Sequence, residues 1–365
     1  MFARTVGGGA ARALLWAGSM VGCSSSGPSG AATDRGSQSS DSGAGDPWAL
    51  RPGASFEGGS PSCPSDAGPA ATGAALWADG TFQTSAVTIA AGTTVVIAPG
   101  ATVKMGAMVT IMVEGTLVAH SACGTHARLA WPTGAAAATG IVVASGGSLV
   151  LDGVDVTGAS APLTVLGGAT AQYDHATIDG AAAPFSVALG GALKTTGAAV
   201  VNTQGSSSIS GSLVAGYLDY DANGNSGILG EDSAQIDISN SKLHGNGPIA
   251  DMVISEGSTG ASIRVSHTEI YDVHCAFHFE PVTTFDLSYM NIHNNAYGFM
   301  LYGSGPSGGT VTYSNIDTSN LVAFDPAGTN GAITFDHCYV PRGAATGPVA
   351  VSNPASSTVA GTGPM

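Results

Sequence analysis

The chain has 365 residues, which is room for one large domain or two ordinary ones. It holds 54 glycines, only 10% charged residues and few aromatic residues, so a thin, repetitive β structure is favoured over a globule with a thick core. The formal charge is −15, and without Arg4 and Arg12 of the leader the chain keeps 8 basic and 25 acidic groups, or −17. This acidity argues against nucleic acids and polyanionic substrates, because phosphate binding needs clustered Lys and Arg.

Residues 1–22 predict a secretory signal peptide, with two arginines, the short apolar run ALLWAGSMV and small residues. The run is too short to span a bilayer, and no later apolar run reaches about 18 residues, so no transmembrane helix is expected. The segment ends in MVGC, Met20–Cys23, and resembles the lipobox of bacterial lipoproteins, with Met20 in place of the usual leucine. The resemblance implies that Cys23 is lipidated, and Ser24 after it is compatible with outer-membrane sorting. An ordinary secretory signal, with Cys23 lost or free, is the alternative.

Residues 23–73 are rich in Ser, Gly, Pro, Asp and Ala. Such a segment cannot bury enough apolar surface to offset the entropy of ordering, so it predicts a disordered, flexible tether. Behind a lipid anchor, the tether holds the folded part, expected over residues 74–345, away from the membrane.

Eight-residue blocks repeat along the folded part and align without gaps. Their first residues are separated by 22, 22, 43, 27, 22, 24 and 24 residues, and the interval of 43 predicts a degenerate repeat near residues 213–220. The blocks are LDGVDVTG from Leu151, YDHATIDG from Tyr173, TTGAAVVN from Thr195, ISNSKLHG from Ile238, VSHTEIYD from Val265, LSYMNIHN from Leu287, VTYSNIDT from Val311 and FDHCYVPR from Phe335.

The columns of these blocks predict short strands with an inward-facing ladder. The sixth position is a branched aliphatic residue throughout, and the fourth is mostly small. A β-branched ladder with a period of 22–27 residues predicts a parallel β-helix, in which each coil adds one residue to each internal stack. Leucine-rich repeats share the period, but their leucine consensus and helical half are absent from the sequence.

The segment Ser85–Thr125 alternates Val, Ile and Met with small residues, and includes the run GTLVA from Gly115. It resembles the opening coils of bacterial right-handed parallel β-helix proteins of the pectate-lyase-like superfamily, and the resemblance extends over roughly residues 85–345. We therefore expect an all-β, right-handed parallel β-helix, a single-stranded solenoid of about eleven coils; the right hand follows from the chirality of parallel crossovers.

The same resemblance implies a carbohydrate-active enzyme, since its members include pectate lyases and polygalacturonases. Uronate lyases combine a calcium-binding acidic cluster with a free arginine or lysine, and polygalacturonase-like hydrolases use paired aspartates near G-H and R-I-K motifs. The sequence carries neither pattern. Glycosidases need two carboxyl groups about 5–10 Å apart. Asp272 and Glu280 are the weak candidates for such a catalytic pair.

One loop predicts an ion site. The stretch YLDYDANGNSGILGED, Tyr217–Asp232, contains D-x-D-x-N-G-N and resembles the first half of a calcium loop. The twelfth position, usually an acid, is Gly230, and Glu231 comes one residue late. The alternatives are a Ca²⁺ site and an Asn/Gly-rich loop extruded from the coil; the candidate ligands are Asp219, Asp221, Asn223, Asn225 and Glu231.

The stretch VSHTEIYDVHCAFHFE, Val265–Glu280, looks like a metal or acid–base site. Aligning the coils stacks Phe277 on Phe299, so that His274, His278 and Glu280 face outward. His274 and His278 are then about 13 Å apart along one strand, too far to share a metal.

An outward ladder of planar side chains passes through the third position of the blocks and is a candidate ligand-binding surface. Its members are His267, Tyr289, Tyr313 and His337. The charges also fall in columns, with Arg264 between Asp237 and Asp286, and Lys242 beside Glu269. These columns favour a decorated wall over a catalytic cluster.

Four cysteines follow Cys23. Cys63 and Cys123 are predicted to form a disulfide that pins the tether to the first coils. Cys275 and Cys338 lie three coils, roughly 14 Å, apart and are predicted to be separate thiols, with Cys338 buried. The absence of a CxxC pair disfavours a zinc site.

These patterns predict an outer-membrane or cell-surface lipoprotein, non-enzymatic, that binds glycan or another envelope component or acts as a structural adhesin. Its expected partners are the membrane, through the anchor, and a polysaccharide, but no nucleic acid. The alternative is a polysaccharide lyase or glycoside hydrolase on the same scaffold. Residues 346–365 are predicted to be a low-complexity tail or a final coil.

Overall fold

The computed structural model describes residues 74–121, 125–132, 139–224, 226–247, 249–256, 260–280, 283–301, 308–324, 332–345 and 349–365. All of them belong to one compact unit, Phe56–Met365. The predicted signal peptide, Cys23, the tether, Cys63, Cys123 and Asn225 lie outside the described residues. No described segment forms a helix long and apolar enough to cross a membrane.

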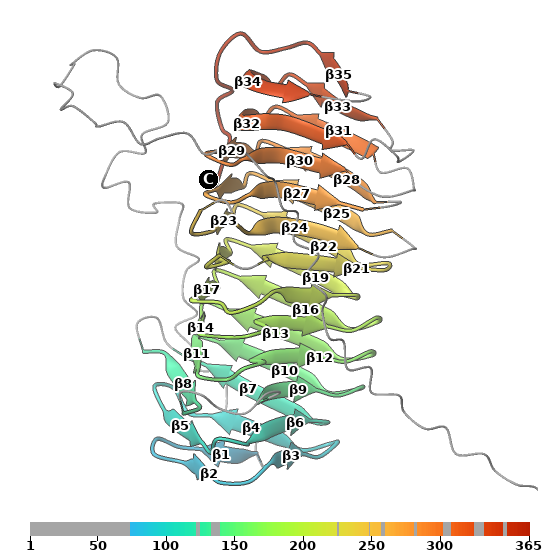
Figure 1. Ribbon diagram of the computed structural model, residues 1–365. Helices are drawn as coiled ribbons and strands as arrows, with labels where there is room; N and C mark the ends of the chain where they lie inside the picture. Colours follow the sequence, from blue (N-terminus) through green and yellow to red (C-terminus); the bar gives the residue numbers. More distant parts are fainter. Residues whose placement is uncertain are drawn as a thin grey trace, which may run out of the picture. The chain divides into compact units, whose positions relative to one another are not determined.

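The described residues form 35 strands, stacked as successive coils (Figure 1). Every strand pairing is parallel, and each complete coil adds one strand to each of three faces. We call them face 1, face 2 and face 3, in the order in which the chain crosses them.

Face 1 comprises β1 (Ala75–Trp77), β4 (Thr94–Ile97), β7 (Thr116–His120), β10 (Ser148–Asp152), β13 (Thr170–Asp174), β16 (Ala192–Thr196), β19 (Ser212–Gly216), β22 (Gln235–Ser239), β25 (Ser262–Ser266), β28 (Thr284–Ser288), β31 (Gly308–Thr312), β33 (Ile333–Asp336) and β35 (Val349–Ser352). Face 2 comprises β2 (Phe82–Gln83), β5 (Thr102–Met105), β8 (Ala127–Ala130), β11 (Val154–Thr157), β14 (Thr177–Asp179), β17 (Ala199–Val201), β20 (Asp219–Asp221), β23 (Lys242–His244), β26 (Glu269–Tyr271) and β29 (Asn291–His293). Face 3 comprises β3 (Val87–Ile89), β6 (Thr110–Val113), β9 (Gly140–Val143), β12 (Leu163–Val165), β15 (Phe185–Val187), β18 (Ser207–Ile209), β21 (Ile228–Glu231), β24 (Asp251–Glu256), β27 (Cys275–Phe279) and β30 (Tyr297–Leu301). The last coils merge faces 2 and 3 in β32 (Asn315–Phe324) and β34 (Tyr339–Ala345).

The predicted all-β parallel solenoid is confirmed. Within the span 85–345, face 1 has eleven described strands, β4 to β33, in agreement with the expected number of coils. β1 precedes this span, and β35 follows it and pairs with β33.

The register inferred from the aligned blocks is also confirmed. Ile270 pairs with Leu243 and Ile292, and Ile292 pairs with Ile316, all of them fully buried. The degenerate repeat supplies Tyr220, which pairs with both Val200 and Leu243 in the same internal column. Apolar stacks of this kind form one continuous core along the coils.

The small residues of the fourth position are buried at the corner between faces 1 and 2. The Ser241 hydroxyl donates to the Ser239 carbonyl (2.7 Å) and accepts from the Leu218 amide of the preceding coil (3.0 Å). Ser314 makes the same pair of bonds with Thr312 and Met290. A small hydroxyl residue therefore satisfies backbone groups that would otherwise be buried without a partner.

The third position of the blocks occupies the left-handed region of the backbone, which the sequence did not predict. His267, Tyr289 and Tyr313 have φ of 48°, 54° and 49°. Positive φ also occurs two residues after the sixth position, for example at Asp272 and Asn294 (56° and 55°). A non-glycine residue in this conformation costs about 1–2 kcal/mol, and here the rings stack on their neighbours in the adjacent coils.

The last residues run back along the coils (Figure 1). After β35, the side chain of Asn315 bonds to the Val359 backbone in both directions (3.1 and 2.8 Å), and to the Thr362 hydroxyl (2.7 Å). The Gly363 amide then donates to the Tyr289 carbonyl (2.9 Å). The end of the chain is thus fixed against the corner beside β29 and β32.

Candidate functional site

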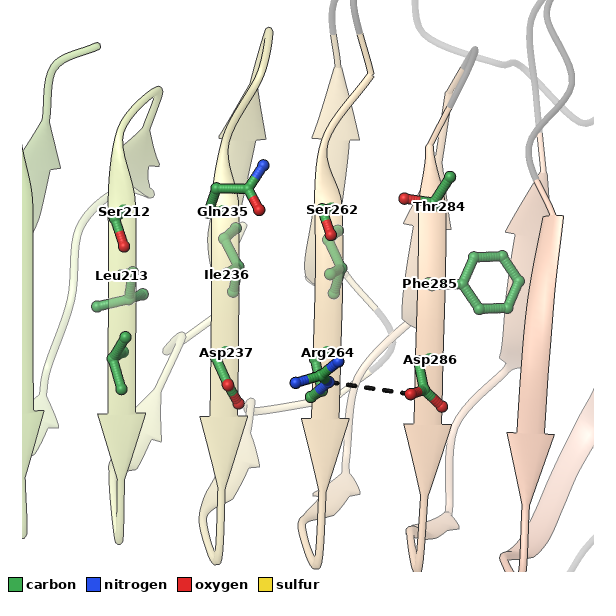
Figure 2. Close-up of a pocket in the computed structure, with 12 residues that line it drawn as sticks. Ser212, Leu213, Gln235, Ile236, Asp237, Ser262, Arg264, Thr284, Phe285 and Asp286 are labelled. Atoms are coloured by element: carbon green, nitrogen blue, oxygen red, sulfur yellow. Dashed lines mark ion pairs between the residues drawn. The ribbon is translucent and has the colours of Figure 1, made fainter. Parts of the chain in front are cut away.

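A solvent-open hollow of about 390 Å³ lies on the outer surface of face 1, across β19, β22, β25 and β28 (Figure 2). Because side chains alternate along a strand, Leu213, Ile236 and Phe285 point into the core and their neighbours point out. The outward side chains form two rows across the strands. They are Ser212, Gln235, Ser262 and Thr284 in one row, and Val214, Asp237, Arg264 and Asp286 in the other.

The charges of this face 1 hollow alternate from coil to coil. Arg264 lies between Asp237 and Asp286 in the register, as predicted, and its Nε is 3.9 Å from an Asp286 carboxylate oxygen (Figure 2). Both side chains of this ion pair are more than 60% exposed, so they remain accessible to a ligand. The hollow thus presents hydroxyls, an amide, two carboxylates, a guanidinium and the half-exposed methyl groups of Val214.

A second polar surface lies on face 3. The Nδ1 atoms of His274 and His278 are each 2.8 Å from one of the two oxygens of Asp251, which begins the neighbouring strand β24. The sequence predicted that these histidines are too far apart to share a metal, and it did not predict that they share a carboxylate. The estimate of about 13 Å concerned their backbone positions, whereas both rings reach across to the same carboxylate of the adjacent coil.

In this His274–Asp251–His278 cluster, burial and the two histidines determine the pKa of Asp251. Burial raises the pKa of Asp251, but hydrogen bonds from His278 and His274 outweigh it and lower the pKa overall. An ionised carboxylate only accepts hydrogen bonds, so each imidazole carries a proton on Nδ1. Beneath the cluster, burial and the charge of Asp251 raise the pKa of the Cys275 thiol, which makes it a poor nucleophile.

Glu256 adds a carboxyl group that the sequence comparison did not single out. It ends β24, pairs with Glu231, and lies one coil before Glu280. Burial, followed by the charges of Glu280 and Glu231, raises the pKa of Glu256, while His278 opposes the shift. The sequence did carry a signal for it: Glu231, Glu256 and Glu280 lie at the ends of the face 3 strands of three successive coils. All three lie outside the aligned blocks.

The two weak catalytic candidates lie at opposite ends of β27. Asp272 is at the corner before the strand and accepts a hydrogen bond from Asn294. Glu280 follows the strand, and the six steps from His274 to Glu280 at about 3.3 Å each place the backbones of the two candidates on the order of 20 Å apart. They do not approach the 5–10 Å separation of a glycosidase pair.

The candidate calcium ligands take partners from the protein. Asp219 accepts from His244 (3.1 Å), Asp221 accepts from the Asn223 amide (2.7 Å), and the Asn223 side-chain oxygen accepts from Asn246 (2.6 Å). Glu231, on β21, accepts from Ser210 (3.1 Å). Since Asn225 lies outside the described residues, calcium binding stays a prediction, tested by the melting temperature with and without a chelator.

The predicted outward ladder is a face-to-face stack of rings. Ring centroids are 4.7 Å apart for His267–Tyr289, 5.3 Å for Tyr289–Tyr313 and 4.9 Å for Tyr313–His337. Stacking engages the ring faces and leaves the edges outward, with Tyr313 39% exposed. A ligand could therefore form hydrogen bonds along this ladder but could not stack on its inner rings.

The remaining paired residues of the sequence analysis are placed as expected. Lys242 is the strand partner of Glu269, which is buried and accepts hydrogen bonds from Asn291 and His293. Cys275 and Cys338 are separate, buried free thiols, as predicted.

No family model, no curated protein and no solved structure matches this chain.

Proposed function

We propose that this protein is an exported β-helix lipoprotein, anchored through Cys23 at the outer membrane or cell surface, which binds glycan through the face 1 hollow without acting on it. The signal-like leader, the MVGC sequence and the Ser/Gly-rich tether support the anchoring. If the bound glycan belongs to a neighbouring cell or surface, the same binding makes the protein a structural adhesin.

The single observation that carries the proposal is the chemistry of the hollow. Sugars present hydroxyl groups around apolar C–H faces, and proteins bind them with planar or charged hydrogen-bonding side chains beside apolar contacts. Gln235, Asp237 and Arg264 supply the first kind of group, and Val214 supplies the second.

A glycan array probed with the full mature chain tests this proposal. We expect binding to a polysaccharide that is lost, by about tenfold or more, in Arg264→Ala. Arg128→Ala is the matched control: Arg128 is also exposed but lies on face 2, where its Nε donates to Thr157 (3.3 Å). Equal binding by wild type and Arg264→Ala, or the same loss in both variants, would contradict the proposal.

A polysaccharide lyase or glycoside hydrolase is the second candidate, and one observation favours it. Glu256 and Glu280 lie in adjacent coils beside His278, and the raised pKa of Glu256 suits a proton donor. A screen for new reducing ends or unsaturated products with neutral and acidic polysaccharides separates the two functions. Turnover by the wild type that is lost in Glu256→Gln or Glu280→Gln would show that the protein is an enzyme and not a glycan-binding protein without activity.

A further inference from the structure

We infer that the glycan is a long linear polymer that lies along the solenoid, across seven coils, and carries widely spaced carboxylates. This inference rests on the proposed function, which needs only the face 1 hollow. It adds the length of the bound segment and the charge of the ligand.

A second hollow of about 610 Å³ continues the first along face 1. It crosses β10, β13, β16 and β19, and it shares Ser212 and Val214 of β19 with the face 1 hollow. The two therefore form one extended hollow from β10 to β28. Six intervals at about 4.8 Å give a length of roughly 29 Å, which suits several sugar residues placed end to end.

The side chains lining the extended hollow form two rows, with one residue of each row in every coil. The first row is small or hydroxyl-bearing except for Gln235: Ser148, Thr170, Ala192, Ser212, Gln235, Ser262 and Thr284. The second row is Val150, Gln172, Lys194, Val214, Asp237, Arg264 and Asp286. A polymer of similar units can lie across such a surface, because in five of the seven coils a unit meets a hydroxyl or amide together with an apolar or charged group. The other two coils offer Thr170 with Gln172, and Ala192 with Lys194.

The charges of the second row select the kind of polymer. Lys194 is exposed, and its neighbours in the row, Gln172 and Val214, are neutral. Among the described residues no carboxylate lies within ion-pair distance of it, so a ligand carboxylate could pair with it. Two coils further along, roughly 10 Å away, Asp237 repels a second carboxylate, and Asp286 does the same beyond Arg264.

A polymer with a carboxylate on every residue would place negative groups against both aspartates. A polymer whose repeating unit holds one uronate among neutral sugars meets one cation and avoids both repulsions. The ligand class is therefore a linear glycan with one carboxylate for every several sugars, rather than a polyanion.

Calorimetric titration with oligosaccharides of increasing length, cut from one such polymer, tests the length of the site. We expect affinity to rise with length until the fragment spans the extended hollow, by about tenfold or more over fragments that fill four coils. Val150→Asp, in the part of the extended hollow that lies outside the face 1 hollow, should reduce this gain and leave the binding of short fragments. Val96→Asp is the control, because Val96 faces outward in the same row of face 1, on β4, outside the hollow.

Lys194→Gln tests the charge. Its affinity for the acidic polymer should fall by about tenfold, while its affinity for the same polymer with reduced carboxyl groups should not change. Lys104→Gln, at an exposed lysine of face 2, should behave as wild type with both.

The outcomes are distinguishable. Binding of short fragments with no gain in length, or no difference between the acidic and reduced polymers in Lys194→Gln, overturns the inference and leaves the proposed function. If no glycan binds at any length, both fail.

Discussion

Face 1 and face 3 of the same coils present similar residue types to solvent, yet they use them differently. On face 3, Asp251 is occupied by His274 and His278. On face 1, Asp237, Arg264 and Asp286 lie in an exposed row, joined only by one ion pair of 3.9 Å. The difference teaches that composition does not identify a binding surface in a solenoid; what matters is whether polar groups bond to the next coil or to solvent.

The largest expected effect separates the two faces by stability. Asp251→Ala removes the acceptor of two hydrogen bonds and leaves two half-buried imidazoles without it, so we expect the free energy of unfolding to fall by about 2–3 kcal/mol. Asp237→Ala, on face 1, should change it by less than about 0.5 kcal/mol. Urea unfolding measures both, and equal losses would erase the distinction between the faces.

The corner beside face 1 gives the next effect. Gly197 has φ of 66°, and an added Cβ would lie 2.9 Å from the His175 ring, so Gly197→Ala should cost about 1–2 kcal/mol. Tyr289→Ala keeps the strained φ and loses the stacks with His267 and Tyr313. Tyr289→Gly relieves that strain and should be more stable than Tyr289→Ala by about 1 kcal/mol. The reverse order in thermal melting would contradict the account of the ring ladder.

The pH dependence of stability follows from His244 on face 2 and Asp251 on face 3. The hydrogen bond from His244 to Asp219 raises the pKa of His244, so its contribution is complete below about pH 6.5 and is lost as the pH rises through the raised value. The pKa of Asp251 is lowered, so its contribution is present above about pH 4 and is lost as the pH falls further.

We therefore expect the highest melting temperature between roughly pH 4 and 6.5. His244→Gln should flatten the decline toward alkaline pH, and Asp251→Asn the decline toward acid. If the melting temperature of His244→Gln falls toward alkaline pH as steeply as that of the wild type, groups other than His244 cause the decline.

The smallest effect concerns the exposed pair of the hollow. Both partners are more than 60% exposed, so a double-mutant cycle of Arg264→Ala and Asp286→Ala should give a coupling energy of about 0–0.5 kcal/mol. A coupling above about 1 kcal/mol would make the pair a structural element, as the bonds of Asp251 are on face 3.

The register could be predicted from the sequence because every coil must place an apolar residue in the same internal stack. Ile270, Ile292 and Ile316 identify one another in this way, and the charge column of Arg264 follows from the same alignment. Interactions between side chains of neighbouring coils are harder to predict from the aligned blocks. They depend on how far a side chain reaches, and on residues such as Asp251 that lie outside the aligned blocks.

A usable signal for these contacts was present. Asp251 and His274 are 23 residues apart, about one coil, and so are Asp152 and His175, whose side chains also bond. The left-handed corner was missed for another reason: Tyr does not favour positive φ, so Tyr289 and Tyr313 do not reveal a conformation imposed by the fold. The hollow was missed because it is a property of the outer surface, whereas the repeat reports chiefly on the core.

The most direct test of glycan binding on face 1 is crosslinking of the full mature chain to a photoreactive oligosaccharide, followed by peptide mapping. We predict labels in the face 1 strands β16, β19, β22, β25 and β28, competed by unlabelled glycan and weakened by Arg264→Ala. Labels confined to β24, β27 and β30 of face 3 would contradict the account and move the site to the His274–Asp251–His278 cluster.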